Sequence, residues 1–334
     1  MTVPKWTSTG RCEAAITRQL RRLVETSGKA GEGTPAPWSK TSLFAHSAIL
    51  LAALLSLVAG RAPAKPAEKA GAESLAWLFA GPGVVAEIAA DAQAARFLVG
   101  TEVFVMTGRA VSTIPPSWNV TICASFKSYA DLKRRLDAGD LDPSVRAVLY
   151  DPEGWRFTPP DEQHTPARHM KMAADLAHAH GLLFIAAPAV NLVEILAPGE
   201  SRGPFRRYET YLRLNLAADA ARYADVIDIQ AQGAEADAQI YGDFVRRAAA
   251  QARAANPKVR IFAGLSTQPG GRDVSAADVL RAIAASHAHV DGYWFNIPRP
   301  GELCPGCTGF RPEIALETLH RLQERGFEAP PSPR

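Results

Sequence analysis

The chain has 334 residues, of which 47% are apolar and 21% are charged, and its formal net charge is +3. These values are typical of a globular protein that is long enough for one large domain with appendages. The net charge is small and the basic residues are scattered along the chain, so the composition argues against a nucleic-acid-binding protein.

An uncharged apolar run, LFAHSAILLAALLSLVAG, occupies residues 43–60 and follows Lys40. A basic flank, an apolar stretch and the small-residue sequence APA after it are typical of a secretory signal peptide or a single membrane anchor. The sequence therefore predicts a tail over 1–42, a signal peptide or anchor over 43–60 and a linker over 61–73. A buried helix of the main domain is the alternative for 43–60. We expect the main domain to be secreted or anchored on the extracytoplasmic face of the membrane.

Short apolar runs alternate with amphipathic segments over the rest of the chain. Strands are predicted at 102–106, 120–125, 147–151, 182–188, 226–232, 260–266 and 292–297. Helices are predicted at 128–139, 166–181, 208–224, 238–255, 276–288 and 312–325, because apolar residues recur there at helical spacing. An eighth strand is expected in ARFLVG (95–100) or elsewhere between 74 and 119.

Strands that alternate with helices predict a parallel sheet with right-handed crossover connections. The length of segment 74–326 suits a (β/α)8 barrel of the TIM type, followed by a disordered tail over 327–334. A glycine-rich phosphate-binding loop does not follow the first predicted strand, which argues against a dinucleotide-binding sheet.

The sequence AVLYDPEGW (147–155) places two acids at the end of a predicted strand. Pro152 has no N–H group to donate, so the strand is expected to end near Asp151. Since side chains alternate along an extended chain, Asp151 and Glu153 are expected to point the same way. Catalytic side chains of (β/α)8 barrels lie at the carboxyl ends of the strands, where both acids are predicted to be.

Polar residues also recur in the predicted strand VIDIQAQ (226–232). Asp228, Gln230 and Gln232 share one face, and the two isoleucines share the other. Inward-facing polar side chains need partners or a ligand, because a barrel interior is normally apolar. Further side chains expected to bind substrate at the same mouth are Trp155, Asn191, Gln268, Trp294 and Asn296.

Two acids, several amides and aromatic rings around one mouth are suited to carbohydrate. Amides supply the mixed donors and acceptors that sugar hydroxyl groups need, and cleavage of a glycosidic bond uses a pair of carboxyl groups. The sequence therefore predicts a hydrolase of a polysaccharide or oligosaccharide. Glu153 is its predicted general acid, and Asp151 is the orienting or second carboxylate. Burial and the neighbouring Asp151 are expected to raise the pKa of Glu153.

The motif Asp151-Pro152-Glu153, together with Trp294 in the last predicted strand, resembles the chitinase-like class of (β/α)8-barrel glycoside hydrolases. The resemblance implies that Glu153 is the general acid, that Asp151 orients a substrate acetamide, and that Trp294 forms the floor of the sugar site. The longer motif of that class has two more aspartates upstream, where this chain has Arg146 and Leu149. This departure argues for a distant glycosidase-like barrel and against substrate-assisted chemistry.

The remaining cysteines, histidines and acidic residues with possible catalytic or metal-binding roles are expected to be structural or to lie near the site. Cys304 and Cys307 form CPGC in a predicted loop, and a local disulfide is favoured over a redox motif or a zinc site. The three histidines at 169, 178 and 180 lack paired-ligand spacing, so no metal is expected, and no cofactor is predicted. Glu162, Gln163 and His164 are expected in a loop over the site.

Two other functions remain open at this point. In the first alternative, the barrel is catalytically inactive and binds glycan or serves as an envelope scaffold. The missing upstream aspartates favour this alternative. In the second alternative it is a lyase or a phosphosugar enzyme that binds phosphate through the loop 269–273 with Arg272.

Overall fold

The computed structural model describes residues 75–200 and 202–326. The predictions for the tail (1–42), the apolar segment (43–60), the linker (61–73) and the C-terminal tail (327–334) lie outside the described residues. Within the described part of the chain, no helix is both long enough and apolar enough to cross a membrane.

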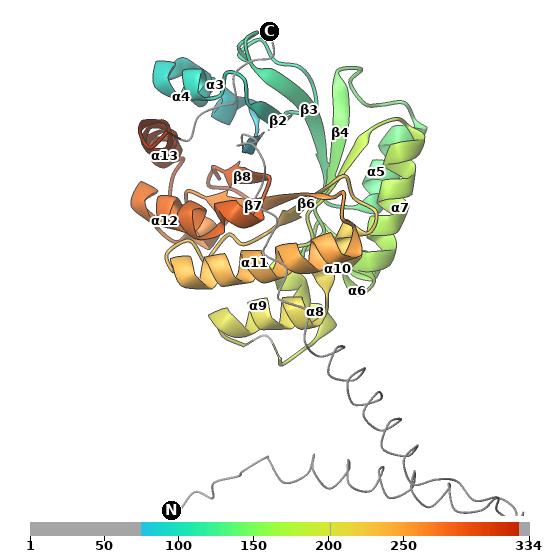
Figure 1. The fold of residues 1–334 in the computed structure, drawn as a ribbon. Coiled ribbons are helices and arrows are strands. Elements are labelled where there is room, and N and C mark those ends of the chain that lie inside the picture. The colour runs from blue at the N-terminus through green and yellow to red at the C-terminus, as the bar shows by residue number, and fades with distance from the viewer. Residues whose placement is uncertain (1–74, 201, 327–334) are drawn as a thin grey trace, which may run out of the picture. The chain divides into compact units, whose positions relative to one another are not determined.

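Eight parallel strands form a closed barrel (Figure 1). They are β1 (Ala76–Ala80), β2 (Glu102–Met106), β3 (Asn119–Phe126), β4 (Val145–Tyr150), β5 (Leu183–Ala186), β6 (Val226–Ile229), β7 (Arg260–Ser266) and β8 (Gly292–Asn296). Each strand pairs with the next in the chain, and β8 pairs with β1 to close the barrel. The predicted alternation and its parallel, consecutive strand order are thereby confirmed, and the architecture is that of a TIM-type barrel.

Helices surround the barrel and cover its outer face (Figure 1). They are α3 (Pro82–Ala90), α4 (Ala92–Phe97), α5 (Tyr129–Asp137), α6 (Pro160–His164), α7 (Pro166–Ala179), α8 (Val193–Leu196), α9 (Pro204–Arg213), α10 (Leu216–Ala221), α11 (Ala238–Ala255), α12 (Ala276–Ser286) and α13 (Pro312–Glu324). Their apolar faces pack against the outer side of the strands, which explains the helical spacing of the apolar residues.

The eighth strand is β1 (Ala76–Ala80), which lies in the predicted stretch 74–119; the other predicted position, ARFLVG (95–100), is wrong, because its first half lies in α4. Helix α4 is favoured because the Asp91 carboxylate accepts hydrogen bonds from the first-turn amides, at 3.1 Å and 2.8 Å. The single helix predicted over 208–224 is divided into α9 and α10 by Asn215, which has a φ of 55°.

The apolar core has two layers, as the alternation within the strands requires. Side chains such as Leu78, Phe104 and Leu149 fill the barrel, and Ile227 and Ile229 belong to the outer layer between strands and helices. The isoleucines of VIDIQAQ therefore face outward, as predicted, and the polar residues between them face inward.

The amino-terminal end of the barrel is closed by a pair of charged side chains. Arg260 begins β7 and forms an ion pair of 2.6 Å with Glu102, which begins β2. The Arg260 guanidinium also lies 5.6 Å and 5.5 Å from the ring centroids of Phe104 and Phe262. At the opposite end of the barrel, the carboxyl ends of the strands surround a large cavity.

Candidate active site

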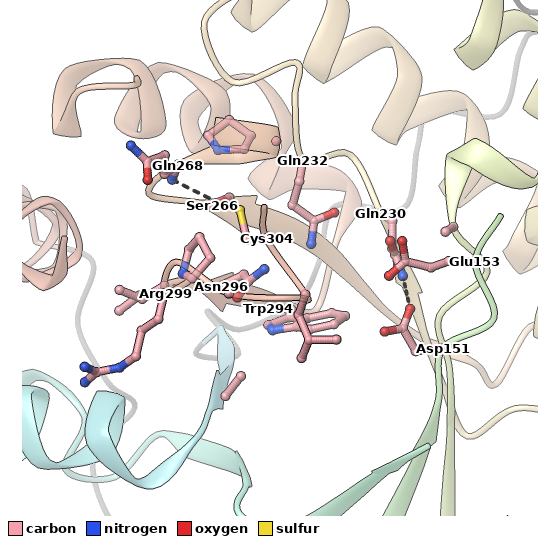
Figure 2. Close-up of a pocket in the computed structure, with 18 of the residues that line it drawn as sticks. Asp151, Glu153, Gln230, Gln232, Ser266, Gln268, Trp294, Asn296, Arg299 and Cys304 are labelled. Atoms are coloured by element: carbon pink, nitrogen blue, oxygen red, sulfur yellow. Dashed lines mark hydrogen bonds between the residues drawn. The ribbon is translucent and has the colours of Figure 1, made fainter. Parts of the chain in front are cut away.

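A cavity of about 1140 Å³ opens at the carboxyl end of the barrel (Figure 2). All nine residues that the sequence analysis assigned to catalysis or substrate binding line it: Asp151, Glu153, Trp155, Asn191, Gln230, Gln232, Gln268, Trp294 and Asn296. They come from the ends of β4 to β8, so the barrel brings together residues that are far apart in the sequence.

Asp151 lies at the buried edge of this cavity, directly after β4. Its backbone N–H donates to the Phe126 carbonyl at 2.9 Å, which continues the β3–β4 pairing by one residue. The carboxylate is 1% exposed and accepts hydrogen bonds from Lys127 Nζ and Gln230 Nε2. Both of its oxygens are therefore occupied, by a side chain that follows β3 and one that follows β6.

Lys127 is a site residue that the sequence analysis missed. It directly follows β3, lines the cavity and forms an ion pair with Asp151. Its Nζ also lies 5.7 Å from the centroid of the Trp155 ring. A lysine at the carboxyl end of a predicted strand is the signal that could have identified it, because such positions converge on the barrel mouth.

Glu153 has a different environment from that of Asp151. It is partly exposed in the cavity, and it accepts one hydrogen bond, from Asn191 Nδ2 at 3.3 Å. Burial first, and then the negative charge of Asp151, raise the pKa of Glu153 to about 8, although Lys127 and Asn191 oppose the shift. Glu153 is therefore mostly protonated at neutral pH and has a proton to donate.

The turn that presents Glu153 is held by a single threonine. Thr158 Oγ1 accepts from the Glu153 N–H at 3.0 Å and from Trp155 Nε1 at 3.1 Å. The same hydroxyl donates to the Lys127 carbonyl at 2.8 Å. This arrangement connects the β3 and β4 ends and fixes the acid, the tryptophan and the lysine relative to one another.

Gly154 follows Glu153 and lets the segment after β5 approach. Its N–H donates to Asn191 Oδ1 at 2.8 Å, and a Cβ at this position would lie 3.1 Å from the Asn191 carbonyl oxygen. The side-chain oxygen of Asn191 thus accepts a hydrogen bond from the turn, and its amide nitrogen donates one to Glu153. The Asp-Pro-Glu-Gly sequence is thus shaped both by the strand that it ends and by the neighbouring asparagine.

The end of β6 contributes the two predicted glutamines. Gln230 bridges Asp151 and the Ala187 carbonyl, to which its Nε2 donates at 2.9 Å. Gln232 lies over Gly264 of β7, where any Cβ would overlap the glutamine amide. No hydrogen-bond partner of the Gln232 amide occurs among the described residues, so this amide is available to a ligand.

Asp228 lies one inward position below Gln230 and is completely buried. Neither of its carboxyl oxygens has a hydrogen-bond partner within the described part of the chain. Burial, followed by the charge of Asp151, raises the pKa of Asp228 well above its usual range. Burial therefore favours the neutral form of the Asp228 carboxyl group.

Trp294 of β8 separates the acids from the opposite wall of the cavity (Figure 2). The side chain is 6% exposed, and its Nε1 has no hydrogen-bond partner among residues 75–200 and 202–326. Asn296 lines the cavity two residues further on. An aromatic surface with amide groups beside it matches the mixed apolar and polar surface of a sugar ring.

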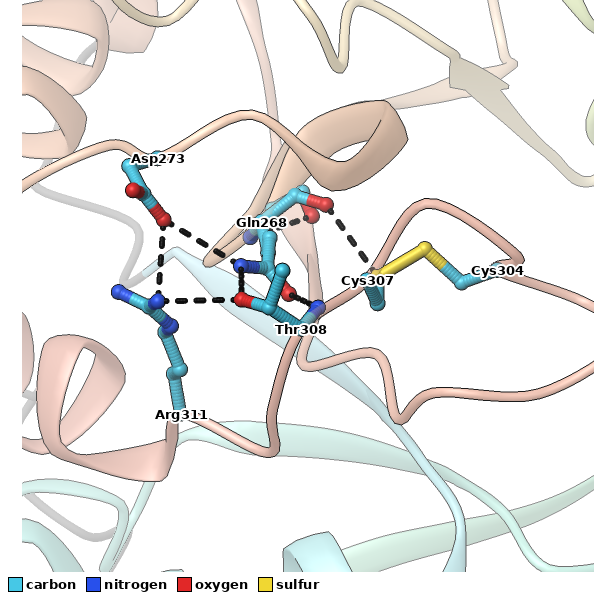
Figure 3. The surroundings of a disulfide bond; sticks show 7 residues. Gln268, Asp273, Cys304, Cys307, Thr308 and Arg311 are labelled. Atoms are coloured by element: carbon cyan, nitrogen blue, oxygen red, sulfur yellow. Dashed lines mark hydrogen bonds and ion pairs between the residues drawn. A yellow bond between two sulfur atoms is a disulfide. The ribbon is translucent and has the colours of Figure 1, made fainter.

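Gln268 lines the cavity, but the protein already uses its amide (Figure 3). Its Nε2 donates to Thr308 Oγ1 at 2.9 Å, and its Oε1 accepts from the Thr308 N–H at 2.9 Å. The loop that it holds contains Cys304 and Cys307, whose sulfur atoms are bonded and whose Cα atoms are 5.4 Å apart. Gln268 therefore positions the wall of the cavity that contains Cys304.

Two other expectations are corrected by the structure. Glu162, Gln163 and His164 form part of α6, and Glu162 is buried and holds the first turn of α5 instead of covering the site. Arg272 donates to the Gly233 carbonyl at 2.6 Å and is absent from the cavity lining, which removes the cation of the predicted phosphate loop. Among the described residues, no group of three or more His, Cys, Asp or Glu side chains is arranged to hold a metal ion.

Comparisons with known proteins support the barrel fold and do not identify a function. No family model matches the chain, and no curated protein matches it. Solved structures with a similar barrel include a putative α-L-fucosidase from Bacteroides thetaiotaomicron (9% identity, 80% of this chain and 98% of that chain, TM-score 0.42). They also include the spore cortex-lytic enzyme SleL from Bacillus megaterium (14%, 70% and 62%, 0.34) and a putative fructose-1,6-biphosphate aldolase from Coccidioides immitis (10%, 78% and 92%, 0.41). Their titles describe different chemistries, and similarities of this size support no functional argument.

Proposed function

We propose that this protein is a glycoside hydrolase that cleaves a polysaccharide or oligosaccharide, with Glu153 as the general acid. The observation that carries the proposal is the environment of Glu153. It is a carboxyl group in a large cavity, it has a pKa raised to about 8, and it lies close to Asp151, which is paired with Lys127. Cleavage of a glycosidic bond needs a carboxyl group that holds a proton near neutral pH, together with a second carboxyl group.

In this proposal Glu153 donates its proton to the glycosidic oxygen as the bond between that oxygen and the anomeric carbon breaks. Positive charge develops on the sugar ring, and the Asp151 carboxylate stabilises it electrostatically. Water adds to the anomeric carbon, and the proton that this water loses restores the acid form of Glu153. Asp151 is 1% exposed and accepts bonds from Lys127 and Gln230, which favours an electrostatic role over direct attack on the sugar.

Substrate binding is assigned to the side chains that retain unused surface. Trp294 and Trp155 provide aromatic faces for sugar rings, and Gln232 and Asn296 provide amides for hydroxyl groups. Asn191 holds the acid and is a positioning residue. Secretion or membrane anchoring of this barrel remains part of the proposal, since it rests on residues 43–60.

A release assay tests the proposal. The full chain and the Glu153→Gln variant are incubated with a panel of soluble polysaccharides, and new reducing ends are measured. We expect wild type to release reducing ends from at least one substrate and Glu153→Gln to release none above background. A wild type that binds glycan without cleaving it would instead support the inactive glycan-binding barrel, for which the missing upstream aspartates argue.

A further inference from the structure

Arg299 is an unpaired cation on the wall of the cavity. It lines the cavity in the loop after β8, and it forms no ion pair or hydrogen bond with any residue of 75–200 or 202–326. Figure 2 shows it across Trp294 from the Asp151–Glu153 pair. A charged group left unpaired beside a binding cavity is available to a ligand of opposite charge.

The guanidinium of Arg299 is held in place although it has no charged partner. It lies 3.5 Å from the centroid of the Phe310 ring, a close cation–π contact. It also lies against Gly83, where a Cβ would be 2.7 Å from one of its terminal nitrogens. Holding the side chain in advance lowers the entropic cost of binding a ligand.

The surroundings of Arg299 add further positive potential. Gly83 belongs to the first turn of α3, whose N-terminus has no side-chain cap and lines the cavity. The N-terminus of a helix carries a partial positive charge. On the same side of the cavity, the buried Trp294 Nε1 is a second hydrogen-bond donor without a partner among the described residues. Two positive groups and an unused donor together favour a negative ligand group.

The other cations of the cavity are neutralised by the protein. Lys127 is paired with Asp151, and Arg207 is paired with Glu194 at 2.8 Å. Arg299 is thus the cavity-lining cation that lacks an acidic partner in the part of the chain that the structure describes.

The acids of the cavity do not neutralise Arg299 either. Glu302 lines the cavity but is paired with Arg156 at 2.8 Å, and Glu153 holds a proton at neutral pH. The Asp151 carboxylate already has Lys127. The cavity therefore carries one positive charge that no acidic side chain among the described residues balances.

We infer that the substrate is an acidic glycan whose carboxylate binds Arg299, at a sugar residue separated by Trp294 from the bond that is cleaved. The planar guanidinium presents two parallel N–H groups, which match the two oxygens of a carboxylate. One unpaired charge matches a singly charged carboxylate better than a doubly charged phosphate monoester. This inference rests on the proposed function and names the substrate class for it.

The test compares oligosaccharides that differ only in charge. The panel contains oligosaccharides from polygalacturonate, alginate, hyaluronan and peptidoglycan glycan strands. Each is compared with the same oligosaccharide after its carboxyl groups have been reduced to alcohols. A sulfated glycan is included as well. Binding is measured calorimetrically with Glu153→Gln, which does not consume the ligand. We expect at least one carboxylate form to bind about tenfold or more tightly than its reduced form, and the difference to shrink at high salt.

Arg299→Gln is then added and should abolish that difference while leaving the affinity for the reduced form unchanged. Arg299→Lys should restore only part of it, because lysine keeps the charge without the planar donor pair. The matched control is Arg135→Gln. Arg135 also lies against a phenylalanine ring, 6.0 Å from the Phe126 centroid, but it pairs with Asp140, and neither residue lines the cavity.

The possible failures of the two proposals are distinguishable. Equal affinity for acidic and reduced chains, a preference for sulfate, or a preference unaffected by Arg299→Gln would overturn the inference and leave the hydrolase proposal intact. Tight, Arg299-dependent binding of an acidic chain that wild type never cleaves would contradict the hydrolase and keep the carboxylate site.

Discussion

Two glutamates in the segment after β4, Glu162 and Glu153, lie in different surroundings, the first fully buried and the second partly buried at the cavity. Glu162 is 2% exposed and satisfied by four donors: Ser128 Oγ at 2.9 Å, Tyr129 N at 2.7 Å, Ala130 N at 3.2 Å and Tyr150 Oη at 2.6 Å. These donors cap α5 and connect it to β4 on the outer side of the barrel. Glu162 is therefore a structural carboxylate.

Glu153, in contrast, has one side-chain donor at 3.3 Å and a negative neighbour. Its carboxyl group lies in the cavity, and its pKa is raised to about 8. The comparison teaches that the number of donors around a shielded carboxylate, more than its burial, separates a residue that stabilises the fold from one that can transfer a proton. Four experiments test this distinction.

The largest effect is expected for Glu153→Gln. Removing a general acid typically lowers the rate by about 10²–10⁴-fold. The melting temperature should stay close to that of wild type, because glutamine has the same shape and removes no fully satisfied hydrogen-bond network. Reducing-end release and differential scanning calorimetry measure the two quantities, and a folded variant with full activity would remove Glu153 from the mechanism.

The second test is the pH dependence of wild-type activity. A general acid must carry its proton, so kcat/KM should be constant below a pKa of about 8 and fall about tenfold per pH unit above it. The alkaline limb is measured from initial rates between about pH 3 and pH 10 at constant ionic strength. An alkaline limb near pH 4.5 would show that Glu153 titrates as an ordinary carboxyl group.

The third test is Glu162→Gln. An amide presents N–H groups to some of the four donors that the carboxylate satisfies, so we expect a loss of about 1–3 kcal/mol in the free energy of unfolding. Urea denaturation measures this loss. The kcat of the folded variant should equal that of wild type; a large drop in kcat without destabilisation would reverse the roles assigned to the two glutamates.

The smallest effect is expected for the pH profile of Lys127→Met. Lys127 lowers the pKa of Glu153 through its positive charge, so its removal should raise the pKa for loss of the last proton from the Asp151–Glu153 pair. The alkaline limb then moves to higher pH, whereas the substitution would abolish activity if Lys127 were itself the acid. Lys133→Met, which changes an exposed lysine paired with Asp137, is the matched control and should leave the limb in place.

Much of the architecture and the position of the acids could be read from local patterns. The alternation of strands and helices predicted a barrel, and Pro152 placed Asp151 and Glu153 at a strand end. The two-residue period of VIDIQAQ correctly placed Gln230 and Gln232 toward the cavity. These inferences succeed because side-chain direction and proline geometry depend on the local backbone alone.

Pairings between distant segments required the tertiary structure. Nothing in the local sequence around Lys127 indicates that it meets Asp151, and nothing around Glu162 indicates that it caps α5. The unpaired state of Arg299 is likewise a property of the closed barrel, since each described acid that lines the cavity already has a partner or a proton. A short stretch of chain determines which way a side chain points, but its protonation and its partners depend on the charges and donors that folding brings to it from other strands.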